Sequence, residues 1–432
     1  MDKTILKHIE NIVNSCGPRI AGSEEEYRAS QYIYKHLQEN CDDTYFDEFD
    51  VYPRFYPHGF LKMASILIIV ALFTIFFSFP YLFLSLGMLL LGLFIIYLSL
   101  FRMNLIFAFD FIFKKSKSWN VTGRIYPRDS NDSRSITKKQ VIVCGHTDSA
   151  FEMSVMDKGF TFLLLGVGYL LISLFLLILK LFFSQSNLIW VQNPLYSNSF
   201  LLFTYIDLIF IGISLIGLPC FLYLLNGLLS GDPVIGANDN LSGVGISLAL
   251  TDYFSKSENR LKNVELWAGS FGSEECGERG AHAFVKKYLK SDEIHPNFSQ
   301  AVIPESVGAG DRVFIISKEF MHNANHHPEV CDRLLQANKI YNHQQSEEKT
   351  NFQALPCSIV ALPFAGSDAG RFAHVGIPSS FYILYEGKTK PRNYHSRKDD
   401  LSNLDSTSLK VSFEMIKNYL ILLDQELEEN QV

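Results

Sequence analysis

The sequence predicts an α/β domain with a mostly parallel mixed sheet, into which four transmembrane helices are inserted as two hairpins. Four apolar runs interrupt the chain, each close to or above the ~20 residues that cross a bilayer as a helix. Outside these runs, short apolar strands alternate with amphipathic helices, which is typical of a parallel sheet with helices on both faces. Because two spans per insertion return the chain to its starting side, the remaining segments can fold as one domain.

The composition agrees with a membrane protein and argues against a nucleic-acid partner. Of the 432 residues, 48% are hydrophobic and 19% are charged, and the deficit of charge lies in the apolar runs. The net charge of −7 comes without a basic tract, so we expect no nucleic-acid binding. The seven cysteines have no regular spacing, which favours a reducing compartment over a disulfide framework.

The first part of the chain predicts two helices and a strand. Residues 4–16 have apolar positions at helical spacing, and Gly17 with Pro18 ends that helix. Ser23 begins a second helix in a capping-box pattern, and this helix extends to about residue 38. Residues 44–52 alternate like a strand.

The apolar runs form two pairs. The first pair is residues 61–101, broken only by Pro80, and the second consists of residues 160–183 and 200–229. A buried pair of soluble helices is the alternative for the second pair. Asp207 lies within the last run, where a charge is costly in lipid, so we expect it to be functional or to pair with a polar group on a neighbouring span.

The rest of the chain predicts the strands and helices of a sheet. We expect residues 121–127 and 140–145 to be paired strands joined by a polar loop. Further strands are expected at residues 263–268, 300–304, 359–364 and 378–384, and helices at residues 241–254, 280–289, 328–338 and 408–428.

The expected soluble domain consists of residues 1–60, 102–159 and 230–432, with transmembrane hairpins at residues 61–101 and 160–229. The basic residues that flank the spans fall mainly on the side of this domain, namely Arg54, Lys62, Arg102, Lys114, Lys115, Lys117 and Lys158, whereas Lys180 falls on the far side. By the positive-inside rule, we expect an integral, multi-pass membrane protein whose catalytic domain is cytoplasmic.

Two adjacent carboxylates, Glu274 and Glu275, follow the buried strand expected at residues 263–268. In open α/β sheets, ligands bind in the crevice beyond the strand ends. Neighbouring carboxylates repel each other and keep both charges only beside a positive group such as a divalent metal. An isolated Glu-Glu pair is far more often a solvated acidic turn, so the pair needs partners elsewhere in the chain.

Such partners occur at other predicted strand ends and in the loops beside them. His146 follows a buried strand, and Asp148 is placed to accept its second ring N–H. Asp239 lies among small residues at a helix start, where a helix cap is the alternative role, while Glu305 ends a strand and His395 lies in a polar loop. Each signal alone is weak, but the set matches a two-metal hydrolytic centre of the kind that suits zinc.

The motifs stand in a characteristic order. They are His146-Thr147-Asp148, Asp239-Asn240-Leu241-Ser242-Gly243, Glu274-Glu275-Cys276-Gly277, the later acid Glu305, Ser367-Asp368 with Gly376-Ile377-Pro378, and Tyr394-His395 with Asp399. This order resembles metallopeptidase family 28, which holds the di-zinc aminopeptidases and the relatives of glutamate carboxypeptidase II. The resemblance covers nearly all the soluble sequence and implies a three-layer zinc-exopeptidase fold.

The resemblance also implies roles for the individual residues. Asp239 would bridge two zinc ions, one of them completed by His146 and Glu305 and the other by Glu275 and His395. Glu274 would be the general base, and Asp148 would orient His146. Asp368 and Asp399 would support the site or the structure around it, and Tyr382, Tyr385 and Tyr394 are candidates for a tyrosine that stabilises the transition state.

The chain departs from the family pattern at two places. Glu305 stands where these enzymes more often have aspartate, and a membrane hairpin separates His146 from Asp239. The resulting prediction is a membrane-anchored zinc aminopeptidase acting on peptides. The alternatives are a glutaminyl-cyclase-like acyltransferase, which would need one zinc, an inactive receptor or scaffold of the same fold, and a transporter.

The second insertion lies close to the predicted centre in the sequence. Asp239 lies ten positions after Leu229, and Phe160 lies fourteen positions after His146. An extended chain spans at most ~3.3–3.6 Å per residue, so Asp239 lies within roughly 35 Å of the membrane exit. We therefore expect the mouth of the site to face or border the bilayer.

Overall fold

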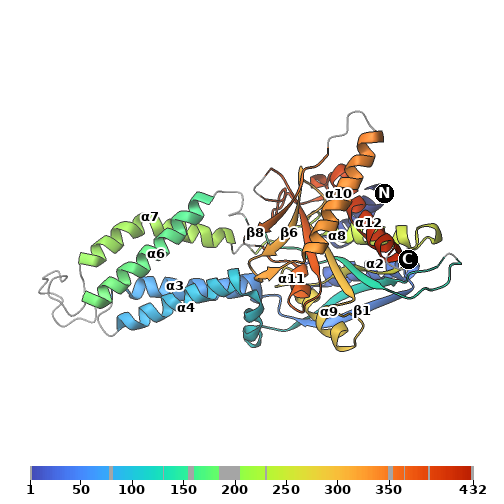
Figure 1. Cartoon of the computed structure of the whole chain (residues 1–432). Coiled ribbons are helices and arrows are strands. Elements are labelled where there is room, and N and C mark those ends of the chain that lie inside the picture. Colours follow the sequence, from blue (N-terminus) through green and yellow to red (C-terminus); the bar gives the residue numbers. More distant parts are fainter. Residues whose placement is uncertain are drawn as a thin grey trace, which may run out of the picture. The chain divides into compact units, whose positions relative to one another are not determined.

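The computed structural model describes residues 2–76, 81–129, 131–153, 160–183, 205–228, 231–348, 354–363, 365–387 and 390–429. The chain divides into two compact units. The sheet domain contains Met1–Arg54, Phe101–Phe151 and Asp232–Val432, and the helical unit contains Phe55–Leu100 and Glu152–Gly231. Both are drawn in Figure 1.

The sheet domain contains a nine-stranded mixed sheet in the order β1-β2-β4-β3-β5-β9-β6-β7, with β8 paired to β6 (Figure 1). The strands β4, β3, β5 and β9 in its middle are parallel, and antiparallel pairs lie on either side of them. The strands are β1 (Asp43–Val51), β2 (Ser116–Ile125), β3 (Lys139–His146), β4 (Val264–Phe271), β5 (Ser299–Glu305), β6 (Arg312–Glu319), β7 (Ala324–Asn325), β8 (Cys357–Leu362) and β9 (Ser379–Tyr385).

Helices cover both faces of this sheet. Val141 and Val143 of β3 belong to one apolar core, while Ile142 and Cys144 belong to the other, because successive strand side chains point to opposite faces. The first core includes α1 (Asp2–Cys16), α2 (Glu24–Asn40), α8 (Leu241–Phe254), α10 (Pro328–Glu348) and α12 (Ser406–Glu429), and the second includes α9 (Arg279–Lys290) and α11 (Asp368–Ala373). The predicted three-layer α/β fold is confirmed.

The prediction that residues 121–127 pair with residues 140–145 is wrong. Instead, β4 lies between these strands, antiparallel to β2 and parallel to β3. Every residue of β4 is buried, so this strand is most stable inside the sheet with a neighbour on each side. The sequence reasoning also missed β6, β7, α11 and the 3₁₀ helix η2 (Met103–Ile112), and α10 continues beyond its predicted end.

The helical unit consists of α3 (Phe60–Thr74), α4 (Tyr81–Phe101), α6 (Phe160–Phe183) and α7 (Tyr205–Leu228), with a short helical turn η1 (Phe55–Gly59) before α3. These four helices of the described chain are long and apolar enough to cross a membrane. The ends of the predicted spans at residues 77–79, 200–204 and 229 lie outside the described residues.

Glycines let the helices of this unit approach one another closely. A β-carbon on Gly92 of α4 would lie 2.6 Å from Cγ1 of Ile68 on α3, and one on Gly217 of α7 would lie 2.3 Å from Cδ2 of Tyr169 on α6. Small residues serve this purpose in membrane helix pairs, where attraction comes from close packing rather than from the exclusion of water.

A buried ion pair joins α6 to α7. Lys180 Nζ lies 2.8 Å from Asp207 Oδ1 and also donates to the carbonyl oxygen of Ile75, at the end of α3, at 2.5 Å. Both charged side chains are fully buried. The expectation that Asp207 pairs with a polar group on a neighbouring span is confirmed, and Lys180 connects three helices.

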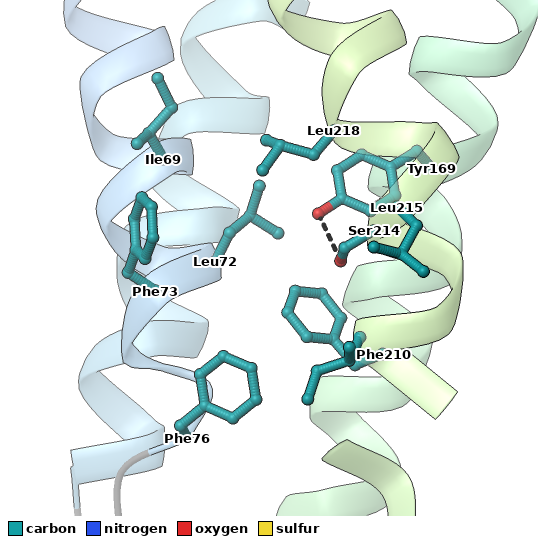
Figure 2. A pocket seen from close by; sticks show the side chains of 10 residues that line it. Ile69, Leu72, Phe73, Phe76, Tyr169, Phe210, Ser214, Leu215 and Leu218 are labelled. Carbon is teal, nitrogen blue, oxygen red and sulfur yellow. Dashed lines mark hydrogen bonds between the residues drawn. The ribbon is translucent and has the colours of Figure 1, made fainter. Parts of the chain in front are cut away.

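The helical unit also contains a pocket of about 250 Å³ between α3, α6 and α7 (Figure 2). Its lining side chains are apolar except for Tyr169 and Ser214, whose hydroxyl oxygens lie 3.0 Å apart. Because these two hydroxyls bond each other, the pocket offers a largely apolar surface.

Candidate metal centre

The six residues predicted to hold metal or move a proton gather at one edge of the sheet. Since β3, β4 and β5 are parallel, their carboxyl ends lie at the same edge. His146 ends β3, Glu305 ends β5, Glu274 and Glu275 follow β4, Asp239 lies just before α8, and His395 lies in the loop after β9.

A close approach of backbone to backbone brings the first histidine to α8. A β-carbon on Gly145 would lie 2.4 Å from the backbone nitrogen of Val244 in the first turns of α8. Glycine therefore lets the end of β3 touch this helix, and His146 then lies next to Asp239.

Two groups of these side chains share Asp239. In the first, His146 Nε2 lies 3.4 Å from Asp239 Oδ1 and 3.5 Å from Glu305 Oε1. In the second, His395 Nε2 lies 3.2 Å from Asp239 Oδ2 and 3.4 Å from Glu275 Oε1. The two oxygens of Asp239 thus face different groups, as a bridging carboxylate requires.

Both groups fit zinc in ligand type and spacing. Ligands bound at ~2.0–2.1 Å in a tetrahedral arrangement lie about 3.3 Å from one another, close to the separations in both groups. Asp239 Oδ2 and Glu275 Oε1 are buried and have no hydrogen-bond donor within the described part of the chain. Buried carboxylate oxygens without donors are costly unless a cation compensates them.

Glu274 lies beside the first group, with Oε2 at 3.9 Å from His146 Nε2. Burial raises the pKa of the Glu274 carboxyl well above its ordinary value, and the nearby Glu278 adds to this increase, while His146 opposes it. A carboxylate with a raised pKa can accept a proton near neutral pH, as a general base must.

Two buried aspartates hold the backbone that carries the ligands. Asp148 accepts the N–H groups of Glu274 at 2.9 Å and of Glu275 at 3.0 Å, one on each carboxylate oxygen. Asp399 accepts the N–H groups of Asn238 at 2.8 Å and of Asp239 at 3.0 Å in the same manner. Each aspartate therefore fixes two consecutive peptide groups at the centre.

Comparisons with known proteins agree with this geometry. The model of peptidase family M28 matches residues 223–420. These residues belong to peptidase family M28. The match contains Asp239, Glu274, Glu275, Glu305 and His395, and it begins after His146, within α7.

The chain is similar in fold to solved structures at low sequence identity. The aminopeptidase from Aneurinibacillus sp. strain AM-1 is 15% identical with a TM-score of 0.51, and the match covers 97% of this chain and 93% of that chain. A leucine aminopeptidase precursor from Bacteroides thetaiotaomicron is 11% identical with a TM-score of 0.51, covering 97% and 96%. A glutaminyl cyclase from an Acidobacteriales bacterium is 12% identical with a TM-score of 0.51, covering 98% and 95%. No curated protein matches the chain by sequence.

The ring of His146 is oriented mainly by a backbone carbonyl. Its Nδ1 lies 3.0 Å from the carbonyl oxygen of Asp148 and 3.4 Å from the Asp148 carboxylate. The expected contact between these two residues is present, but the carboxylate also holds the Glu274–Glu275 backbone, a role that the sequence reasoning did not foresee.

The three candidate tyrosines lie in different surroundings. The ring of Tyr394 stacks on His395 with centroids 3.9 Å apart, so this tyrosine lies at the M28 centre. By contrast, Tyr382 donates its hydroxyl to the carbonyl oxygen of Ser412 in the core, and Tyr385 packs against Phe314. Burial and the carboxylates of the centre raise the pKa of Tyr394 well above its usual value, so its hydroxyl remains a donor.

Asp368 is fully buried at the start of α11 and belongs to neither ligand group. Neither of its carboxylate oxygens has a hydrogen-bond partner among the residues that the structure describes. Burial raises the pKa of this carboxyl well above its ordinary value, which favours the protonated form.

Two supporting residues were not predicted from sequence. Asn240 donates from Nδ2 to the carbonyl oxygen of Pro304 at 2.8 Å and to Glu305 Oε2 at 3.1 Å. The fully buried Glu26 accepts the N–H of Ser273, next to Glu274, at 2.9 Å. Both lie at helix starts, and their contacts across the fold carry no local sequence signal.

Proposed function

We propose that this protein is a membrane-anchored, zinc-dependent aminopeptidase that uses two zinc ions. The observation that carries the proposal is the sharing of Asp239 between two ligand groups, each completed by one histidine and one glutamate. Membership of family M28 supports peptide-bond hydrolysis, and the similar aminopeptidases support removal of N-terminal residues.

Zinc held by these residues would polarise the scissile carbonyl and lower the pKa of water. Glu274 takes the proton from the attacking water and delivers it to the leaving amine, for which its raised pKa is suited. Tyr394 offers a hydroxyl donor for the negative charge that develops on the carbonyl oxygen. Asp148 and Asp399 keep the ligand-bearing backbone in place.

The decisive experiment combines metal analysis with activity measurements on the full chain in detergent. We expect two zinc ions at this centre and hydrolysis of aminoacyl-fluorophores by the wild type. Glu274→Gln should keep the zinc and lose activity by about 10²–10⁴-fold, the usual contribution of a general base. The exposed Glu347→Gln, the same chemical change on α10, is the matched control.

Full activity of Glu274→Gln would refute the proposed mechanism. The panel should include a peptide with N-terminal glutamine, because glutaminyl cyclases share the fold. Cyclisation of this peptide without aminoacyl hydrolysis would instead assign the acyltransferase reaction. Zinc binding without either reaction would favour a receptor or scaffold.

The proposal includes a bilayer anchor and a cytoplasmic M28 domain. Four helices suited to a membrane and the distribution of basic residues support it. A green fluorescent protein fused after Val432 folds and fluoresces only on the cytoplasmic side in bacteria, so a dark but expressed fusion would overturn the orientation. The short connections to Asp239 and His146 also favour peptide substrates held near the bilayer.

A further inference from the structure

A second cluster of metal-type ligands lies where α1, α2 and α8 contact one another. It consists of His8 on α1, His36 on α2 and Asp252 near the end of α8. We propose that these three side chains bind one zinc ion at a site separate from the M28 centre. This inference does not depend on the proposed function.

One ligand atom from each of the three side chains lies within 4.8 Å of the other two, so a single ion can contact all three. His8 Nε2 lies 3.3 Å from Asp252 Oδ2, and His36 Nε2 lies 3.1 Å from Asp252 Oδ1. Tetrahedral zinc places its ligand atoms about 3.3 Å apart, whereas a charge-assisted N–H···O bond is usually about 2.7–2.9 Å. The separations also match those of the M28 centre, where His146 and His395 lie 3.2–3.5 Å from their carboxylate partners.

The surroundings orient one of the histidines for a metal. His8 Nδ1 lies 3.0 Å from the hydroxyl of Tyr32, and that hydroxyl accepts a hydrogen bond from Asn11. A proton on His8 Nδ1 can therefore point to Tyr32 and leave the Nε2 lone pair directed at Asp252. Metal-bound histidines typically donate their second ring N–H to an oxygen acceptor, and the Tyr32 hydroxyl oxygen can serve as one.

The site is partly open to solvent. The side chains of His8, His36 and Asp252 are 8%, 15% and 25% exposed. Three protein ligands with an accessible side leave the fourth tetrahedral position to water. The amide nitrogen of Asn40, 3.4 Å from His36 Nε2, is a further polar neighbour.

The α8 helix separates this cluster from the M28 centre. Asp239 lies just before the first turn of α8, and Asp252 lies in its last turn. At ~1.5 Å per residue, the helix places them roughly 20 Å apart, too far to share an ion. Zinc at this site would connect α1 and α2 to the end of the helix whose start carries the bridging aspartate.

The alternative is a hydrogen-bonded triad without metal, in which each histidine donates a proton to one oxygen of Asp252. Zinc counting on the full chain in detergent separates the two cases. The wild type, His36→Gln, Asp252→Asn and the control His343→Gln are equilibrated with the same buffered zinc solution. His343 is a suitable control because its side chain is 74% exposed on α10.

We expect His36→Gln and Asp252→Asn to hold one zinc fewer per chain than the wild type and His343→Gln. Tyr32→Phe should keep the site but weaken it about 10- to 100-fold, the usual effect of losing a partner behind a ligand. The experiment compares the zinc content of variants and wild type, so zinc bound at the M28 centre contributes equally to both and does not affect the difference of one ion. Equal zinc contents in the wild type and His36→Gln would overturn the proposal.

A second measurement on the wild type covers the case in which the variants fail to fold. Zinc should protect His36 from acylation by diethyl pyrocarbonate, read by peptide mass spectrometry, while His343 stays reactive. Equal modification of His36 with and without zinc would overturn the proposal.

Discussion

Replacing Asp399 with asparagine should weaken zinc binding at the M28 centre while leaving the metal-free protein folded. The carboxylate accepts two backbone N–H groups at 2.8 and 3.0 Å, next to and at Asp239. An asparagine can accept with only one of its two terminal atoms, so one of these charge-assisted bonds is lost. Such a bond contributes about 1.5–3 kcal/mol. Expressed as affinity, this range is a factor of roughly 10 to 150 in the zinc dissociation constant.

The loss of this hydrogen bond should lower the affinity for zinc rather than the stability of the metal-free protein. Burial and the neighbouring Asp239 raise the pKa of Asp399 from 3.8 to about 6. Ionising Asp399 at pH 7.5 therefore costs the metal-free fold about 3 kcal/mol, which is of the same order as the lost bond and offsets it. Because the pKa of Asp399 is higher in the folded than in the unfolded chain, the protonated carboxyl stabilises the fold. This stabilisation is fully present below pH ~4 and is lost as the pH rises through about 6. Asp399→Asn should remove that part of the pH dependence.

The assay is a competition titration of zinc against a chromophoric chelator, with thermal unfolding of the metal-free proteins in parallel. The control is Asp311→Asn, because exposed Asp311 also accepts a backbone N–H, that of Gly387. The control should bind zinc like the wild type. A dissociation constant for Asp399→Asn within twofold of the wild type would refute the reasoning, as would equal weakening in the control.

Three further predictions concern the ion pair, the proposed base and the tyrosine. Lys180→Met should destabilise the helical unit by about 3–5 kcal/mol in mixed micelles, because it leaves the buried Asp207 without this partner. Adding Asp207→Leu should restore much of the lost stability. A double variant as unstable as Lys180→Met alone would contradict this prediction. Glu278→Gln should move the acidic limb of the pH profile of kcat/KM to lower pH, since Glu278 raises the pKa of Glu274; a shift to higher pH would exclude this coupling. Tyr394→Phe should lower kcat by about 10²–10³-fold with the zinc content unchanged, and an unaltered kcat would leave Tyr394 only a stacking role.

Much of the fold can be predicted from local patterns in the sequence. The apolar runs predicted α4 and α6 because an uninterrupted run of membrane length has few other stable environments. The amphipathic pattern and cap predicted α2, and its Ser23 does accept the N–H of Glu26. The position of β4 between β2 and β3 could not be predicted from its own residues. Its pairing depends on which other strands have a free edge when the sheet forms.

The sequence by itself determined which side chains are available for metal binding. The two histidines, the adjacent glutamates and the aspartate at a helix start can be identified from residue type and order alone. Only the tertiary structure decided which atoms face one another. It directed the two oxygens of Asp239 toward different histidines, brought Tyr394 rather than Tyr382 to the centre, and placed Lys180 beside Asp207. Residue type and spacing along the chain set what each segment can do, whereas the contacts of Asp239 and of Lys180 join residues far apart in sequence, and their geometry arises only when the sheet and helices pack.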